Sequence, residues 1–513
     1  MNIKRNLTIS GLALLAYISA GAQFVNPVTE AVLRNYAEIL AENPKDYFTL
    51  YDRAQQYFDM GEFDRALSDI EMAIEYTPDK DKDYRLAEYS LKGEILSAQK
   101  KYEDAISAIN TALSINPVSQ SDLYKLGNLN ILVNRPDAAL KAFEALQREN
   151  PRSQEAFYGM AKANAMLGNK EKVEDLIKEI EILGKQSYIT YCRIGDLYSD
   201  MGNIKEATTN YAIAYSMEDE NLRPVASLKL LVKKNPDLVM TTIDGIIASK
   251  PDNLAMNYLQ AILAFEDGQY SRAEKATKDL AGGVEKESSA IYRMMAMSQH
   301  FQNKNDEAKE SIMKAESISP NELGVLLDKS EILLTISPDQ SYEAAIKAVN
   351  ISPNSEASLL AAAKSSIMTG RYAEALDFLN NVILSNPANA EAILLRGYLN
   401  TEYLNDGKAG VTDYTRAGNL KTSEKVRDLA LKALAKSKIN KKLDADGLIK
   451  EAIEKSNNKE DYYFIAVYFA QTGNLEKAKE YADKALSNGY SNLYNIKTDA
   501  QPLFNLRPIQ HLN

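Results

Sequence analysis

The chain has 513 residues, of which 45% are apolar and 26% are charged, so it can bury a core and is too apolar for a disordered protein. Its 71 acidic and 60 basic residues give a formal net charge of -11, which argues against a nucleic-acid partner held through its phosphates. With no Trp, 2 His and 1 Cys, the composition excludes disulfide scaffolds, Cys/His metal sites and most histidine-dependent catalysis. No pair of carboxylates stands out as catalytic. We therefore expect no enzymatic activity, no metal and no cofactor.

The first 22 residues have the features of an export signal. Lys4 and Arg5 precede an apolar stretch over residues 7–22, which is short for a membrane span of roughly 20 residues. The small residues Ala20 and Ala22 fit a signal-peptidase site, so we expect cleavage after Ala22. The alternative is an uncleaved N-terminal anchor. The sequence thus predicts an exported, periplasmic protein, or one that is secreted or associated with the outer membrane.

Beyond this segment, small residues recur at a nearly constant interval inside apolar helical patterns. Ten of these ladder positions are Ala54, Gly93, Gly127, Ala161, Gly195, Ala261, Ala296, Ala363, Gly397 and Ala466. Three more, needed to complete the series, are Lys229, Lys329 and Leu431. The mean spacing is about 34 residues, a period typical of arrays of helix hairpins.

Three further series keep the same phase, and each has a structural reason. Twelve residues after the ladder position stands an Ala that lets a second helix approach the first: Ala66, Ala105, Ala139, Ala207, Ala273, Ala308, Ala375 and Ala478. Seven residues after it stands a Gly suited to a tight turn with positive φ: Gly61, Gly168, Gly202, Gly268, Gly370 and Gly473. A Pro such as Pro78 follows the second helix and prevents its continuation. A single hairpin cannot bury its own apolar face, so the hairpins must stack into a solenoid.

With these series in place, the chain resembles the tetratricopeptide repeat family from about residue 28 to residue 500. In one unit the family's pattern positions are occupied by Leu50, Ala54, Tyr57, Gly61, Ala66, Ile70, Ala73 and Pro78. The resemblance implies an all-α protein, a right-handed α-solenoid superhelix of about 13 stacked helix hairpins.

The expected organisation follows from the series and from the places where it weakens. The segments are a signal peptide (1–22), an N-terminal capping helix (23–46), repeat units 1–5 (47–221), a degenerate unit (222–253), units 7–11 (254–423), a degenerate basic unit (424–458), the last unit (459–490) and a C-terminal cap (491–513). In 222–253 the small-residue pair is lost, so we expect a looser or shifted hairpin. The charged run 79–83 should be a surface loop.

The family resemblance also implies that ligands bind on the concave surface made by the first helix of each unit. Candidate contacts on that surface are Tyr51, Gln55, Tyr124, Asn128, Tyr158, Lys162 and Asp196. Tyr124, Asn128, Tyr158 and Lys162 belong to two successive units, and their rings, amide and ammonium suit an extended peptide or a carboxylate. The alternative is that the tyrosines cover the seam between neighbouring helices. The Lys/Asn clamp by which some members of the family hold acidic tails is absent here, because no unit has Lys at the required position.

Charge is uneven along the chain. Residues 28–120 hold 18 acidic and 10 basic residues, a net charge of −8, whereas residues 391–513 hold 16 and 19, a net charge of +3. Within the positive region Lys432, Lys436 and Lys442 form a basic patch that would dock an acidic partner or anionic lipid headgroups. The alternative is a solvated helix face.

Together these features predict a non-catalytic protein–protein interaction scaffold of the bacterial cell envelope that binds protein or peptide segments in its concave groove. No nucleic-acid partner is expected, and peripheral association with envelope components is expected through the basic patch. The sequence indicates no oligomeric state. An alternative function is a glycan-binding component of an outer-membrane uptake system, although the chain has no Trp for sugar stacking and no room for a separate binding domain.

Overall fold

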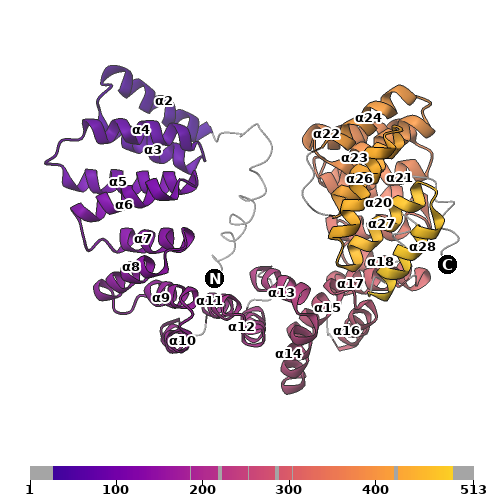
Figure 1. The fold of residues 1–513 in the computed structure, drawn as a ribbon, viewed down its shortest axis with the longest axis horizontal. Helices are drawn as coiled ribbons and strands as arrows, with labels where there is room; N and C mark the ends of the chain where they lie inside the picture. Colours follow the sequence, from indigo (N-terminus) through magenta and orange to yellow (C-terminus); the bar gives the residue numbers. More distant parts are fainter. Residues whose placement is uncertain are drawn as a thin grey trace, which may run out of the picture. The chain divides into compact units, whose positions relative to one another are not determined.

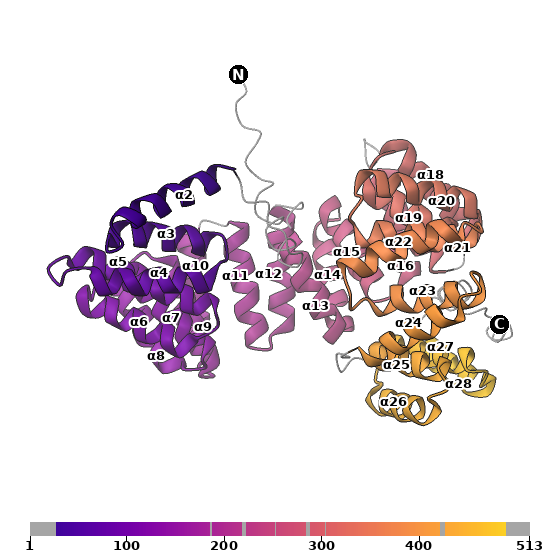
Figure 2. The same ribbon diagram turned by 90° about the horizontal axis from the view of Figure 1, so that it is seen from above.

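A computed structural model describes residues 27–184, 187–217, 222–251, 253–283, 288–302, 304–420 and 426–488. Within these ranges the regular structure consists of 27 α-helices (Figure 1 and Figure 2). The described residues divide into two compact units, those within residues 1–227 (unit 1) and those within residues 228–513 (unit 2). The predicted signal peptide and C-terminal cap lie outside the described residues. No described helix has the length and apolar character that crossing a membrane requires.

Unit 1 begins with the single helix α2 (Pro27–Glu42), which lies in the segment expected to cap the array, and continues with helix hairpins. The first helices of its hairpins are α3 (Tyr47–Asp59), α5 (Lys82–Ala98), α7 (Gln120–Leu132), α9 (Gln154–Met166) and α11 (Tyr188–Asp200). Their second helices are α4 (Phe63–Tyr76), α6 (Tyr102–Ile115), α8 (Pro136–Glu149), α10 (Lys170–Gly184) and α12 (Ile204–Met217). The boundary between the units falls inside the next helix, α13 (Leu222–Lys234).

Unit 2 continues the same alternation. After α14 (Pro236–Ser249), its first helices are α15 (Leu254–Glu266), α17 (Ser289–His300), α19 (Leu323–Leu333), α21 (Glu356–Met368), α23 (Ala390–Glu402), α25 (Val426–Lys438) and α27 (Lys459–Gln471). Their second helices are α16 (Tyr270–Gly283), α18 (Asn305–Ile318), α20 (Pro338–Ile351), α22 (Tyr372–Ser385), α24 (Gly407–Asn419), α26 (Lys442–Lys455) and α28 (Leu475–Ser487). With α2 apart, the described helices form thirteen consecutive pairs, which confirms the all-α solenoid of about 13 hairpins.

The small-residue series forms the contact between the two helices of a hairpin. Ala54 and Ala66 are both fully buried between α3 and α4. Where the ladder residue is Gly, a large side chain of the second helix fills the space beside it: a Cβ on Gly127 would lie 2.5 Å from the Phe143 ring, which no real contact allows. All six predicted turn glycines have positive φ, between 73° and 81°. Both series therefore do in the structure what their spacing predicts.

None of the three inferred ladder positions holds the buried contact between the two helices of its hairpin. In α19 the position is held by Ser330, which is 34 residues after Ala296, is 2% exposed and lies 3.1 Å from the Ser341 hydroxyl of α20. The predicted Lys329 is displaced by one residue and forms an ion pair with Glu316 at 2.6 Å. A short hydroxyl fits this contact between helices, whereas an ammonium group would be left without water.

In α25 the ladder position is Ala433, not Leu431. Ala433 faces α26 with Ala445, both residues are fully buried, and Asn440 takes the positive φ of the turn at 59°. Ala433 lies 36 residues after Gly397 because six residues connect α24 to α25, whereas four connect α22 to α23. The segment 424–458, expected to be degenerate, therefore keeps its small-residue pair.

The segment 222–253 replaces small residues by larger ones. Leu228 and Val232 are fully buried in α13, while Lys229 has a side chain 41% exposed and pairs with Glu266 at 3.1 Å. A single residue, Asn235, separates α13 from α14, because Pro236 starts the new helix at once. The hairpin here is thus shifted relative to its neighbours.

The charged run 79–83 is only partly a loop. Residues 79–81 form a turn, but Lys82 and Asp83 belong to the first turn of α5, which has 17 residues where α3 and α7 have 13. An acidic residue in the first turn of a helix is stabilised by the free backbone N–H groups there. The inserted residues therefore lengthen a helix.

Candidate partner-binding surfaces

Successive first helices contact one another in both units, for example α7 with α9 and α9 with α11. In unit 1, helices α3, α5 and α7 enclose a pocket of about 360 Å³. Its apolar lining includes Phe58, Ile109 and Leu129, and Ile109 reaches it from the second-helix layer because Gly93 has no side chain in the way. At the rim, Tyr124 and Leu132 are 39% and 58% exposed. The pocket is therefore apolar inside and open to solvent.

The polar groups at this rim differ in how far they are already bonded. The Lys125 ammonium bridges α7 to α5 by an ion pair with Glu94 and a 2.6 Å hydrogen bond to the Ser90 hydroxyl. Neither the Asn128 amide nor the Tyr124 hydroxyl bonds to any of the described residues. Two of the predicted contacts, Tyr124 and Asn128, are thus brought together in one pocket with their polar groups available.

Two other predicted contacts of unit 1, Tyr158 and Asp196, already form hydrogen bonds or ion pairs within the protein. The Tyr158 hydroxyl lies 3.4 Å from an oxygen of Asp196, on the next first helix. The same carboxylate accepts a hydrogen bond from Tyr211 at 2.7 Å and pairs with Arg223 at 2.8 Å. Burial first, and the Asp196 charge second, raise the pKa of Tyr158. This geometry joins α9 to α11, as expected of a residue that covers a seam.

The remaining candidates of unit 1 lie outside the pocket under Tyr124. Lys162 lies one turn beyond Tyr158, and its charge lowers the pKa of Asp200, which burial raises overall. Gln55 donates to Asp59 of its own helix at 3.0 Å. Tyr51 belongs to a group of four aromatic rings at the start of α3 and α5. The sequence did not single out Phe58 and Leu132, because the contacts predicted on the first helices were all tyrosines, amides or charged residues.

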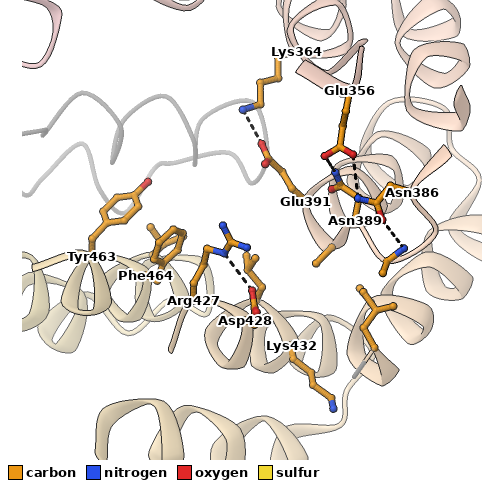
Figure 3. A pocket seen from close by; sticks show the side chains of 16 residues that line it. Glu356, Lys364, Asn386, Asn389, Glu391, Arg427, Asp428, Lys432, Tyr463 and Phe464 are labelled. Atoms are coloured by element: carbon orange, nitrogen blue, oxygen red, sulfur yellow. Dashed lines mark hydrogen bonds and ion pairs between the residues drawn. The ribbon is translucent and has the colours of Figure 1, made fainter. Parts of the chain in front are cut away.

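In unit 2 a pocket of about 500 Å³ is lined by the first helices α21, α23, α25 and α27 (Figure 3). Lys364 of α21 pairs with Glu391 of α23 at 2.7 Å, and this charge is the main reason that the pKa of Glu391 is lowered. Asn386 and Asn389 both donate to the Glu356 carboxylate, at 3.0 and 2.7 Å. Figure 3 shows these pairs on one side of the pocket, with Phe464 and Tyr463 on the other. Most charges of this pocket are thus bonded to one another.

The three lysines of the basic patch are not equivalent. Lys432 lines the unit 2 pocket and forms no ion pair with the described residues. Lys436 is largely buried, with a side chain 15% exposed, and donates to Asn419 at 3.0 Å. Lys442 is exposed at the start of α26. Only Lys432 and Lys442 therefore offer an unpaired charge to a partner.

Models of the tetratricopeptide repeat match five stretches of the chain. They cover residues 89–119, 124–184, 188–221, 290–322 and 462–488. The chain contains tetratricopeptide repeats. Such repeats are protein–protein interaction scaffolds that bind peptides or proteins and are typically non-catalytic. The matches confirm the repeat family and the scaffold class that the sequence predicts.

Several solved structures are similar in fold to this repeat protein. A tetratricopeptide repeat protein from Parabacteroides merdae is 20% identical, with 56% of this chain and 97% of that chain covered and a TM-score of 0.29. Yeast Tom70 is 14% identical, with 80% and 100% covered and a TM-score of 0.36. YrrB, described as having an unusual peptide-binding site, is 17% identical, with 37% and 96% covered and a TM-score of 0.30. At these values the similarity says nothing about function. The comparison with curated proteins gave no match.

Proposed function

We propose that this tetratricopeptide repeat protein is an exported scaffold of the bacterial cell envelope, and that it holds an extended peptide segment against helices α3, α5 and α7. The observation that carries the proposal is the pocket under Tyr124. Its volume of about 360 Å³ lies in the range of ligand sites, roughly 300–1,000 Å³. An apolar side chain of the peptide would fill the space between Phe58 and Leu129.

The Asn128 amide and the Tyr124 hydroxyl, which form no internal hydrogen bond with the described residues, would hold the backbone of the bound peptide. An amide such as Asn128 offers both a donor and an acceptor, which matches the N–H and C=O of an extended chain. Tyr124 adds a flat ring of low conformational entropy beside its free hydroxyl. Neither group must break an internal hydrogen bond in order to bind, so the partner meets no such cost.

Export and location rest on the sequence. The charged start, the short apolar stretch and the small residues before Gln23 favour secretion and cleavage. A periplasmic protein would meet its partners in the envelope, and Lys432 and Lys442 would favour peripheral association with acidic envelope components there. Nucleic acid remains an unfavourable partner for a chain with a net charge of -11.

The peptide site is tested with the mature chain and a displayed library of random peptides. Peptides recovered on the protein are measured by fluorescence anisotropy against Tyr124→Ala, Leu132→Ala and Asn128→Ala. We expect the first two substitutions to weaken binding about tenfold, because each removes apolar contact at the rim. Leu384→Ala is the matched control, since Leu384 is 81% exposed on the second helix α22. Peptides that bind all variants equally, or retention on polysaccharide without peptide binding, would contradict the proposal.

Export is tested separately by N-terminal sequencing of the protein from fractionated cells of the native host. Material that begins near Gln23 in a soluble envelope fraction or in the medium is the expected result. A cytoplasmic product that retains Met1 would end this part of the proposal and leave the peptide site untouched.

A further inference from the structure

Four aromatic rings gather at the N-terminal ends of α3 and α5, outside the pocket under Tyr124. Phe48 lies 4.1 Å from Tyr47 and 4.6 Å from Tyr84, between ring centroids, and Tyr51 lies 6.5 Å from Tyr84. Phe48 and Tyr84 meet edge to face, with an interplanar angle of 88°. They are also 42% and 39% exposed. Large apolar rings are thus left in contact with water.

The inserted residues of the second repeat build this surface. Tyr84 lies in the additional first turn of α5, the turn that makes this helix longer than α3 and α7. Just before that turn, Asp81 accepts a hydrogen bond from the Tyr47 hydroxyl at 2.7 Å. On the α3 side, Asp46 caps the helix by accepting from the Thr49 backbone N–H at 3.3 Å. Both edges of the cluster are therefore fixed by carboxylates.

The surroundings of the rings are negative. Among the described residues no lysine or arginine pairs with Asp46, Asp52 or Asp81. The negative charges affect the pKa values of nearby groups. The hydrogen bond to Asp81 raises the pKa of Tyr47 to about 12, and burial followed by the Asp46 charge raises the pKa of Asp52. Of the nearby cations, Arg85 pairs with Asp79 at 3.0 Å, and Lys80 and Lys82, which flank Asp81 in the sequence, form no ion pair with it. The wider region, residues 28–120, carries a net charge of −8, from 18 acidic and 10 basic residues.

We propose that this aromatic–acidic surface, made of Tyr47, Phe48, Tyr51 and Tyr84 with Asp46, Asp52 and Asp81, binds a cationic peptide segment. An arginine or lysine side chain would lie over a ring of Phe48 or Tyr84, whose face attracts a positive charge. The same charge would relieve the repulsion among carboxylates that lack a cationic partner. Arginine should bind better than lysine, because its planar group also stacks on aromatic rings. The inference adds a partner class to the proposed scaffold and does not depend on the pocket under Tyr124.

Charge complementarity selects this occupant over a neutral glycan. A sugar would also stack on the exposed rings, but it would leave the unpaired carboxylates as they are. An acidic segment would meet direct repulsion from Asp46 and Asp52. A cationic segment uses both features of the surface, the rings and the charge.

The test uses the mature chain and three labelled probes in fluorescence anisotropy: a flexible peptide with three spaced arginines, the same peptide with lysines, and the same peptide with glutamates. A neutral glucan hexasaccharide, measured by calorimetry, is the fourth probe. We expect the order arginine, lysine, glutamate, with no measurable binding of the last. Affinity should fall as salt rises, because the carboxylates are partly exposed.

Two variants separate the contributions of ring and charge. Phe48→Leu keeps an apolar residue and removes the aromatic face, so arginine-peptide binding should weaken about tenfold. Asp52→Asn removes an exposed charge that makes no hydrogen bond with the described residues, and should weaken binding about threefold. Tyr124→Ala is the control and should leave the arginine peptide bound as before, which separates this proposal from the peptide site.

Each other outcome overturns the proposal. Equal binding of the arginine and glutamate peptides would remove the charge preference. Arginine binding unaffected by Phe48→Leu would reduce the surface to unspecific charge attraction. Binding of the glucan that is lost in Phe48→Leu, without arginine binding, would assign the rings to a carbohydrate. Circular dichroism melting of each variant ensures that a lost signal is not lost folding.

Discussion

Equivalent positions on the first helices carry different chemistry in the two units. In unit 1 the fifth position of α7 is Tyr124 and the ninth is Asn128, and the polar groups of both remain available. In unit 2 the fifth position of α17 is Arg293, which pairs with Glu322 at 2.8 Å and Asp328 at 2.7 Å. The ninth position of α21 is Lys364, paired with Glu391 at 2.7 Å. Repeat position therefore does not decide whether a residue is free to bind; the residue facing it on the next hairpin does.

A second contrast concerns one buried carboxyl group in each unit. Glu88 of unit 1 is fully buried, has one oxygen without a hydrogen-bond partner, and burial raises its pKa. Glu274 of unit 2 is also buried, but Lys278, Lys304 and two glutamines bond to it and lower its pKa to about 2 against the opposing effect of burial. The buried glutamate of unit 1 therefore makes that unit less stable as the pH rises toward neutrality. The buried glutamate of unit 2 makes that unit less stable as the pH falls into the acid range.

The largest effect is expected from acidifying unit 2. The folded pKa of Glu274, about 2, lies below its ordinary value, so its contribution to stability is present above pH 4.5 and is lost as the pH falls toward 2. The loss should amount to about 3 kcal/mol in the free energy of opening of α16, measured by hydrogen exchange of its amides. Glu274→Gln should remove most of this pH dependence. Glu310→Gln, at an exposed position of α18, is the control and should retain it.

The tightness of the hairpins gives the next effect. Phe143 touches two glycines, and an added Cβ would lie 2.5 Å from its ring at Gly127 and 2.4 Å at Gly159. Because the ring is fully buried and confined on both sides, Gly127→Ala in unit 1 should cost about 2 kcal/mol. Gly397→Ala in unit 2 meets Tyr414 at 3.0 Å, where a smaller shift suffices, and should cost less than about 1 kcal/mol. Urea unfolding measures both, and equal costs would show that the second helix simply moves away.

The tyrosines of α7 and α9 separate binding from packing. Tyr158→Ala removes one of the hydrogen-bond donors of Asp196 and part of the seam between α9 and α11, which should cost about 1.5 kcal/mol of unfolding free energy. Tyr124→Ala removes a ring that is 39% exposed and has no hydrogen bond to the described residues, and should cost less than the Tyr158 substitution, about 0.5–1 kcal/mol. Thermal melting of the two variants makes the comparison. If the Tyr124 variant melts at a lower temperature than the Tyr158 variant, Tyr124 is a packing residue of the seam between neighbouring helices and not a binding residue.

Much of the fold was predictable because the repeat imposes the same steric condition at every hairpin. The turn glycines and the buried alanines follow from that condition alone, and six of six turn glycines have positive φ. The two errors have different sources. Ser330 follows Ala296 by the regular 34 residues, and its neighbour Lys329 was assigned in its place, whereas Ala433 lies 36 residues after Gly397 because six residues rather than four connect α24 to α25. A constant period cannot register such a shift.

The candidate sites were less predictable than the fold, for a different reason. Tyr124 and Tyr158 hold the same repeat position, yet of the two only Tyr158 bonds to a carboxylate on the next first helix. Whether such a partner lies opposite depends on the relative placement of two hairpins, which the pattern of one repeat does not contain. The aromatic cluster depended on the same kind of information, because Tyr84 reaches Phe48 only through the additional turn of α5.

The smallest effect is expected at Glu88 and has the opposite sign. Because its folded pKa is raised, its favourable contribution is present below pH 4.5 and is lost as the pH rises through the folded value. The Thr77 hydroxyl lies 2.9 Å from the Ala73 carbonyl oxygen and can donate to it while a protonated Glu88, or a glutamine, donates to Thr77. Glu88→Gln should therefore raise the free energy of unfolding at pH 7 by about 0.5–1 kcal/mol and change nothing at pH 4. Urea unfolding at the two pH values, with the exposed Glu75→Gln as control, measures the difference; a glutamine variant less stable at pH 7 would mean that the buried charge is favourable and that unit 1 resembles unit 2.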